Sequence, residues 1–156
     1  MKIKAKIENF KFKNSNAILK ILNKKFILSP WIINTFRKVK LKKKYQLPIK
    51  VVEINLKKDL NILKPTYLQI IHRKLKKHGY ELISPEIAMY TCLFLEIKKP
   101  GKWIRFATPL QSLVDDDGIP HLPKLGFGLK KKYIETYWAY KKAVFHPHNN
   151  FIVLKK

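Results

Sequence analysis

Three runs of cationic side chains, one of them interleaved with aromatic rings, have the chemistry to bind phosphate groups. Lysine and arginine neutralise phosphates and release the counterions condensed on them, so such binding is favourable and salt-dependent. Neighbouring aromatic rings can stack on bases. The residues that we expect to contact nucleic acid are Arg37, Lys38, Lys40, Lys42, Lys43, Lys44, Arg73, Lys74, Lys76, Lys77, Lys130, Lys131, Lys132, Tyr137, Lys141 and Lys142. A structural alternative stays open for two of the runs. Residues 37–44 would also suit a solvated helix end, and Tyr137 would also suit the core.

Glu96 and Lys98 are one residue apart in an apolar run, and they form the second candidate site. If this run is a strand, the pair resembles the E-x-K half of a PD-(D/E)xK nuclease site. That resemblance implies a Glu that holds Mg²⁺ and a Lys that stabilises the attacking water or the developing phosphate charge. The upstream acid of the motif would have to be Glu81, Glu86 or Asp59, and none of them lies in a Pro-Asp turn.

A third candidate combines His121 with Gly126 and Gly128, two glycines that would let a backbone approach phosphate closely. Residues 118–129 resemble the glycine-rich loop of the RNA endonucleases that cleave CRISPR repeats. The resemblance implies metal-free RNA cleavage, with a His such as His121 as acid or base. The chain departs from that family in two ways: 27 residues follow Leu129, and no His precedes His72. A tight turn around Phe127 is the structural alternative.

No metal site and no cofactor are expected, except Mg²⁺ if Glu96 and Lys98 form a nuclease site. His146 and His148 could supply half a metal site, but no Cys or His partner has zinc-finger spacing. Asp115, Asp116 and Asp117 precede Gly118, and this composition predicts a turn without any ligand.

The charge balance favours a polyanionic partner. The chain of 156 residues has 34 Lys and Arg against 10 Asp and Glu, a formal charge of +24. Such a charge disfavours the compact state by self-repulsion, and nucleic acid relieves that repulsion. We therefore expect a nucleic-acid-binding protein, part of a larger nucleoprotein complex with other proteins. The alternatives are a small nuclease and a basic scaffold protein that binds an acidic protein partner.

The elements that position these residues begin with a strand. Residues 3–13 alternate between apolar and charged side chains, which predicts a half-buried strand with a basic outer face. A helix is expected to follow, with Ser15 or Asn16 as its N-cap. Ser29 and Pro30 predict a second helix, whose stripe includes Trp31, Ile32 and Phe36 and which continues into residues 37–44. A strand over 47–56 and a helix over 66–78, stopped by Gly79, complete this half.

The apolar runs and turn residues of the second half indicate an antiparallel sheet. Ser84-Pro85-Glu86 predicts a short helix, and the apolar runs 90–97 and 103–110 predict a hairpin around Pro100-Gly101. Residues 129–142 fit a helix or a strand, with helix favoured by the length, and residues 151–154 fit a closing strand. The expected fold is α+β: an N-terminal strand-helix-helix-strand-helix portion and a C-terminal antiparallel meander in one compact domain, with 1–83 and 84–156 as a possible division.

The expected location is the cytoplasm or the interior of an organelle. Cys92 is the single cysteine and lies in an apolar run, which suits a reducing compartment. The first residues contain no apolar signal-peptide core, so no secretion signal is expected. No apolar run approaches the ~20 residues of a membrane span, so no membrane partner is expected.

Overall fold

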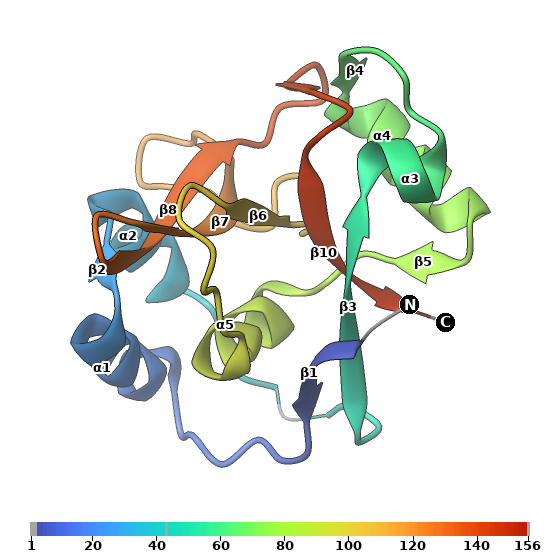
Figure 1. Cartoon of the computed structure of the whole chain (residues 1–156). Coiled ribbons are helices and arrows are strands. Elements are labelled where there is room, and N and C mark those ends of the chain that lie inside the picture. The colour runs from blue at the N-terminus through green and yellow to red at the C-terminus, as the bar shows by residue number, and fades with distance from the viewer. Residues whose placement is uncertain (1–2, 43, 156) are drawn as a thin grey trace.

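The computed structural model describes residues 3–42 and 44–155 and confirms an α+β fold in a single domain (Figure 1). In chain order the elements are β1 (Ile3–Ile7), α1 (Ser15–Lys25), β2 (Ile27–Leu28), α2 (Pro30–Phe36), β3 (Ile49–Asn55), α3 (Leu56–Leu60), β4 (Thr66–Tyr67), α4 (Leu68–Lys77), β5 (Tyr80–Glu81), α5 (Pro85–Phe94), β6 (Trp103–Phe106), β7 (His121–Gly128), β8 (Lys131–Trp138), β9 (Val144–Phe145) and β10 (Asn150–Lys155).

One curled mixed sheet joins the two halves of the chain. Its strand order is β1-β3-β10-β6-β7-β8-β2, with β5 also paired to β10, while β4 and β9 form a separate small pair. The expected meander is present as the antiparallel strands β6, β7 and β8. Strand β10 then pairs parallel to β6 and antiparallel to β3, so it holds the meander against the N-terminal half (Figure 1).

Each face of the curled sheet carries its own hydrophobic core. Successive strand residues point to opposite faces, so Val51 of β3 is buried in the first core and Val52 in the second. Helices α1, α2 and α5 cover the first core, and α3 and α4 cover the second (Figure 1). Each fully buried Leu or Ile contributes about 1.5–3 kcal/mol, so both cores are substantial.

Two of the helix starts confirm the Ser-Pro signals. The hydroxyl oxygens of Ser29 and Ser84 accept hydrogen bonds from the backbone N–H groups of Ile32 and Ile87, each at 3.2 Å. The first helix differs, because its N-cap is Asn14 rather than Ser15 or Asn16. The Ser15 hydroxyl is buried and donates to the carbonyl of Arg37 at 2.9 Å instead.

The basic run 37–44 is not helical, contrary to expectation. Helix α2 ends at Phe36, one turn follows, and the chain then continues without regular structure; Lys43 lies outside the described residues. A helix would place like charges three and four residues apart, where they destabilise each other. The irregular path instead lets the Lys42 N–H donate to Glu86 on α5 at 2.5 Å.

The run 90–97 is also not the expected strand, because α5 continues through Phe94. Its residues from Glu86 to Cys92 are buried on all sides, and a continuous apolar run does not distinguish a buried helix from a buried strand. The predicted first strand is shorter than expected, since β1 ends at Ile7.

Residues 129–142 form strand β8 and its continuation rather than a helix. Strand β8 pairs residue by residue with β7, from His121 opposite Trp138 to Gly128 opposite Lys131. The two connecting residues, Leu129 and Lys130, have φ of 50° and 62°. Two positive φ values in a two-residue loop match the right-handed twist of paired strands, so this tight turn sets the register of the hairpin.

Among the helices of residues 3–42 and 44–155, none is long and apolar enough to cross a membrane.

Candidate nucleic-acid interface

A row of four rings lies at the end of β8 and includes three large aromatics that are about half exposed. Trp31 stacks on His121 with centroids 5.6 Å apart, His121 contacts Trp138 at 5.9 Å, and Trp138 stacks on Tyr140 at 6.3 Å. The exposed fractions of Trp31, Trp138 and Tyr140 are 48%, 50% and 48%. We call Trp31, His121, Trp138 and Tyr140 the aromatic row. Exposed, contiguous aromatics of this size mark interaction surfaces.

His121 is the buried anchor of the aromatic row. Its Nε2 is 2.8 Å from an Asp115 carboxylate oxygen, and its Nδ1 is 3.0 Å from the Thr136 hydroxyl. The hydrogen bond from His121, with further ones from the Ile119 and Asp117 N–H groups, lowers the pKa of Asp115. Both ring nitrogens are therefore engaged inside the protein, where they fix the plane of the ring between Trp31 and Trp138.

Cationic side chains lie at both ends of the aromatic row. Lys141 and Lys142 follow Tyr140 and are exposed. At the other end, Arg37 and Lys38 lie 3.2 Å and 2.5 Å from the Asp116 carboxylate and lower its pKa. Asp115, which contacts His121, and its neighbour Asp117 add two more carboxylates at this end, so the positive charge beside the row comes mainly from Lys141 and Lys142.

Two open cavities flank Tyr140. The first, of about 480 Å³, lies between Trp138, Tyr140 and Lys142. The second, of about 440 Å³, is lined by Leu110, Ala139 and Tyr140, together with Lys141 and Lys142. Apolar walls with a cationic edge suit a flat apolar ring that is attached to a phosphate.

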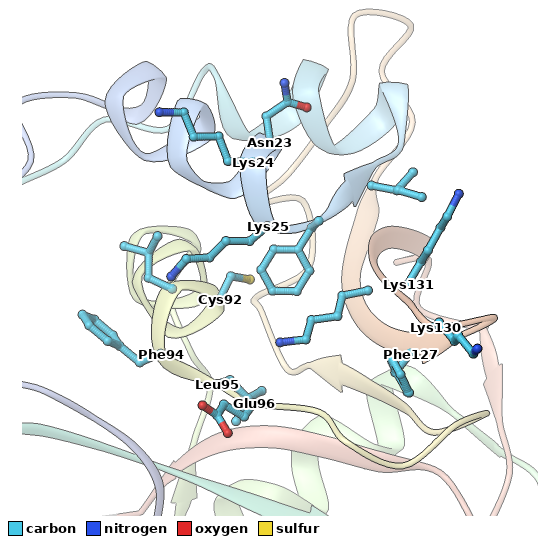
Figure 2. Close-up of a pocket in the computed structure, with 14 residues that line it drawn as sticks. Asn23, Lys24, Lys25, Cys92, Phe94, Leu95, Glu96, Phe127, Lys130 and Lys131 are labelled. Carbon is cyan, nitrogen blue, oxygen red and sulfur yellow. The ribbon is translucent and has the colours of Figure 1, made fainter.

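A further cavity of about 670 Å³ lies between the ends of α1 and α5 and the β7–β8 turn (Figure 2). Its walls include Phe26, Leu95 and Phe127, while Lys24, Lys130 and Lys131 point outward from its edge. The five lysines that line it, which we call the basic rim, are Lys24, Lys25, Lys130, Lys131 and Lys132. Lys24 and Lys25 also belong to the last turn of α1, where cations stabilise a helix.

The basic rim and the aromatic row lie at opposite ends of β8, which spans roughly 23 Å at the usual rise per residue. Ion pairs between described residues join Lys4 and Lys102 to Glu53, Lys6 to Glu8, Arg37 and Lys38 to Asp116, and Lys98 to Glu96. The lysines of the basic rim, and Lys141 and Lys142, take part in none of these pairs. Their charges remain available to an external anion.

The other predicted cations lie elsewhere on the surface. Arg73, Lys76 and Lys77 are exposed on α4, which packs on the second core away from α2 and the basic rim (Figure 1). Lys40 and Lys42 are exposed near α5, and Lys44 is exposed in the same irregular segment. The structure thus brings Lys130–Lys132 and Lys141–Lys142 to the two ends of one strand and separates them from residues 73–77.

Tyr137 is half-buried on the face opposite to Trp138. Its ring lies 4.9 Å from that of Phe145, and its hydroxyl donates to the Val144 carbonyl at 3.3 Å. Strand alternation therefore turns Tyr137 toward the second core and leaves its neighbour Trp138 at the surface.

Glu96 and Lys98 lie in the connection between α5 and β6, not in the strand that the nuclease hypothesis requires. Their side chains form an exposed ion pair at 3.4 Å, with 69% and 86% exposure. Within the part of the chain that the structure describes, no three His, Cys, Asp or Glu side chains converge to hold a metal ion. Glu96, Asp115–Asp117 and the His146–His148 pair are among these side chains.

Gly126 and Gly128 are strand residues of β7 and do not form a loop. A Cβ at Gly126 would lie 2.4–2.6 Å from ring atoms of Trp103, so glycine is needed here for the indole to lie on the strand. Nothing lies within 4 Å of a Cβ built at Gly128.

This contrast gives a paired prediction. Gly126→Ala should displace the Trp103 ring and lower the free energy of unfolding by about 1–3 kcal/mol, the usual cost of overpacking. Gly128→Ala, in the same strand, should change it far less. Urea denaturation of both variants measures the difference, and equal stability of the two would contradict the close packing of Trp103 on Gly126.

The residues of the candidate interface that sequence reasoning missed are Lys24, Lys25 and Trp31. Trp31 was expected in the buried stripe of its helix, yet it follows Pro30 in the first turn and faces outward. For Lys24 and Lys25 the only signal in the sequence is that cations are common at the end of a helix. The chain has also been compared with known proteins, and it matches no family model, no curated protein and no solved structure.

Proposed function

We propose that this protein binds single-stranded nucleic acid through the aromatic row, with phosphates held by Lys141, Lys142 and the basic rim. The observation that carries the proposal is the row itself: three half-exposed rings, stacked through a buried His121 and bordered by unpaired lysines. Aromatic side chains stack on bases at about 1–3 kcal/mol per base in proteins that bind single strands.

The preference for a single strand follows from the kind of contact. A base must be unstacked from its neighbours before its flat face can lie on Trp138 or Tyr140, and this is already possible in a single strand. Paired bases in a duplex expose edges rather than faces, so a duplex would use the lysines alone.

The net charge of +24 supports a nucleic acid over a neutral partner. Lysine-rich surfaces give strong, salt-dependent attraction to phosphate with little sequence preference. In a cell such a surface would work within a nucleoprotein complex with other proteins, as the composition also predicts. An acidic protein partner is the competing occupant, and it would need the lysines but not the base-sized cavities beside Tyr140.

An abasic oligonucleotide separates stacking from charge. A labelled deoxythymidine dodecamer and an abasic dodecamer with the same phosphates are compared by fluorescence anisotropy at equal salt. We expect the abasic strand to bind at least ~10-fold more weakly, because it offers nothing to stack on the rings. Equal affinity for both strands, or equal competition by polyglutamate, would replace the proposal with purely electrostatic binding of an acidic partner.

A further inference from the structure

A second surface with cations and aromatic rings lies on the opposite side of the β6–β8 meander. Residues that oppose each other in an antiparallel pair point to the same face. Helices α3 and α4 cover this face over β3 and β10, where Val52, Ile54 and Phe151 are buried. The half-buried residues beyond them form what we call the open face: Trp103, Arg105, Lys124, Tyr133, Glu135 and Tyr137.

The open face places two cations next to each other. Arg105 of β6 and Lys124 of β7 are direct cross-strand partners. Like charges in that relation destabilise a sheet. Neither cation belongs to the ion pairs given above, and Glu135, which opposes Lys124 on β8, stays outside ion-pair distance.

Both cations are also partly removed from water. The Arg105 Nε is buried and has no hydrogen-bond acceptor among the described residues. The guanidinium lies 6.0 Å and 5.9 Å from the ring centroids of Tyr137 and Phe145, and the Lys124 ammonium lies 4.7 Å from that of Trp103. The rings attract the charges but do not replace the oxygen acceptors that water supplied.

The pKa values of the two groups change in the direction that this arrangement predicts. Burial lowers the pKa of Arg105. Burial also lowers the pKa of Lys124, and repulsion from Arg105 lowers it further, against a smaller opposing effect of Glu135. The protein therefore holds two adjacent positive charges in a place that is unfavourable without an anion.

We propose that Arg105 and Lys124 bind a phosphate of the nucleic-acid strand, with Trp103 and Tyr133 beside them as surfaces for its bases. A phosphate supplies the missing acceptors and separates the two like charges, and a guanidinium can bind two of its oxygens at once. Since Tyr137 and Trp138 are consecutive and face opposite ways, one strand can pass from the aromatic row to the open face around the end of β8. This inference rests on the proposed function.

A site of this kind has a signature that a purely structural pair would lack. Replacing Arg105 and Lys124 by Gln should weaken binding and at the same time stabilise the free protein, because the repulsion and the buried unpaired charge are removed. The melting temperature without ligand should rise by about 2 °C or more. A fall in melting temperature would mean that the two cations serve the fold, and it would overturn the inference.

Trp103 can report binding at the open face when it is the only tryptophan. The Trp31→Phe/Trp138→Phe protein leaves Trp103 alone. Its emission is followed during titration with a deoxythymidine dodecamer and, separately, with thymidine monophosphate. We expect the dodecamer to change the emission and the monophosphate to do so only at much higher concentration. An emission change with the monophosphate at the same concentration would mean a nucleotide site and not a strand site.

Charge-matched variants of the otherwise wild-type protein complete the test, by anisotropy of the labelled dodecamer. Arg105→Gln/Lys124→Gln should weaken binding about 10-fold and reduce the salt slope, since both cationic contacts to the bound phosphate are lost. Lys20→Gln/Lys50→Gln removes two exposed lysines outside both surfaces and should leave the slope unchanged. Arg105→Lys keeps the charge and should weaken binding without changing the slope.

Failure of the inference is distinct from failure of the proposed function. If the dodecamer raises the anisotropy but the emission of Trp103 stays constant and the two double variants bind equally, the open face is not a phosphate site. If the wild-type protein gives no anisotropy change, the proposed function itself fails.

Discussion

Replacing Trp31 and Trp138 together by Ala should weaken the binding of a single-stranded dodecamer about 100-fold, since each lost stacking contact is worth about 1–3 kcal/mol. The slope of log affinity against log salt should stay the same, because the phosphate contacts of the lysines remain. Fluorescence anisotropy over a salt series measures both quantities. Circular dichroism checks that the double variant is folded.

The matched control for this prediction is Tyr67→Ala. Tyr67 is 41% exposed on β4, where it pairs with Val144 of β9, so it is a nearby exposed ring that does not belong to the aromatic row. Its replacement should leave the affinity within about threefold of wild type, as expected for a surface position outside the energetically dominant contacts. An equal loss in both variants would show that exposed aromatics in general, and not the row, affect binding.

A pH change from 7 to 4 should lower the free energy of unfolding by about 3 kcal/mol through His72 alone. His72 is buried in α4, and its Nε2 has no hydrogen-bond partner among the described residues. Burial, with repulsion from Lys76, lowers its pKa from 6.5 to about 4. At a pH between these two pKa values, His72 is protonated in the unfolded chain but neutral in the folded protein. The free energy of unfolding therefore falls as the pH falls.

Urea denaturation at pH 7, 5.5 and 4 tests this prediction. His72→Gln should remove most of the pH dependence in that window, whereas His78→Gln, at the exposed end of the same helix, should retain it. The carboxylates with lowered pKa values, among them Glu53, also lose stabilisation in acid, but at lower pH than His72. An unchanged acid response of His72→Gln would contradict the assignment.

The parts of the fold that the sequence predicted correctly depend on local signals. Ser29-Pro30 and Ser84-Pro85 specify their helix starts through one side-chain hydrogen bond each. Gly79, with φ of 83°, ends α4 as predicted, and the closing strand β10 was recognised from its apolar run. These features need no knowledge of the rest of the chain.

The parts that were wrong depend on tertiary context. Residues 129–142 are a strand because β7 pairs with them over eight positions, and length alone had favoured a helix. The path of residues 37–42 depends on partners that are distant in the sequence, such as Glu86, which accepts from the Lys42 backbone, and Ser15, which donates to the Arg37 carbonyl. Residues 90–94 of the apolar run needed the full burial of α5 to be recognised as helical.

The candidate site shows the same division between local signals and tertiary context. The cations and aromatics of residues 130–142 could be recognised as a cluster, but which ring faces solvent depended on the strand alternation that turns Trp138 outward and Tyr137 inward. The stacking of Trp31 on His121 joins two segments 90 residues apart, and the pairing of Arg105 with Lys124 requires the register of β6 on β7. No single-sequence pattern contains either contact.

The measurement that tests the central claim most directly is fluorescence anisotropy of labelled single-stranded and duplex DNA and RNA over a salt series, with the same samples run on a denaturing gel with Mg²⁺ and with EDTA. We predict tighter binding of single strands, a log–log salt slope of roughly −4 for about six phosphate contacts, and intact oligonucleotides in every lane. Cleavage would make the protein a nuclease instead. No binding to any oligonucleotide at low salt would contradict the account and favour an acidic protein partner.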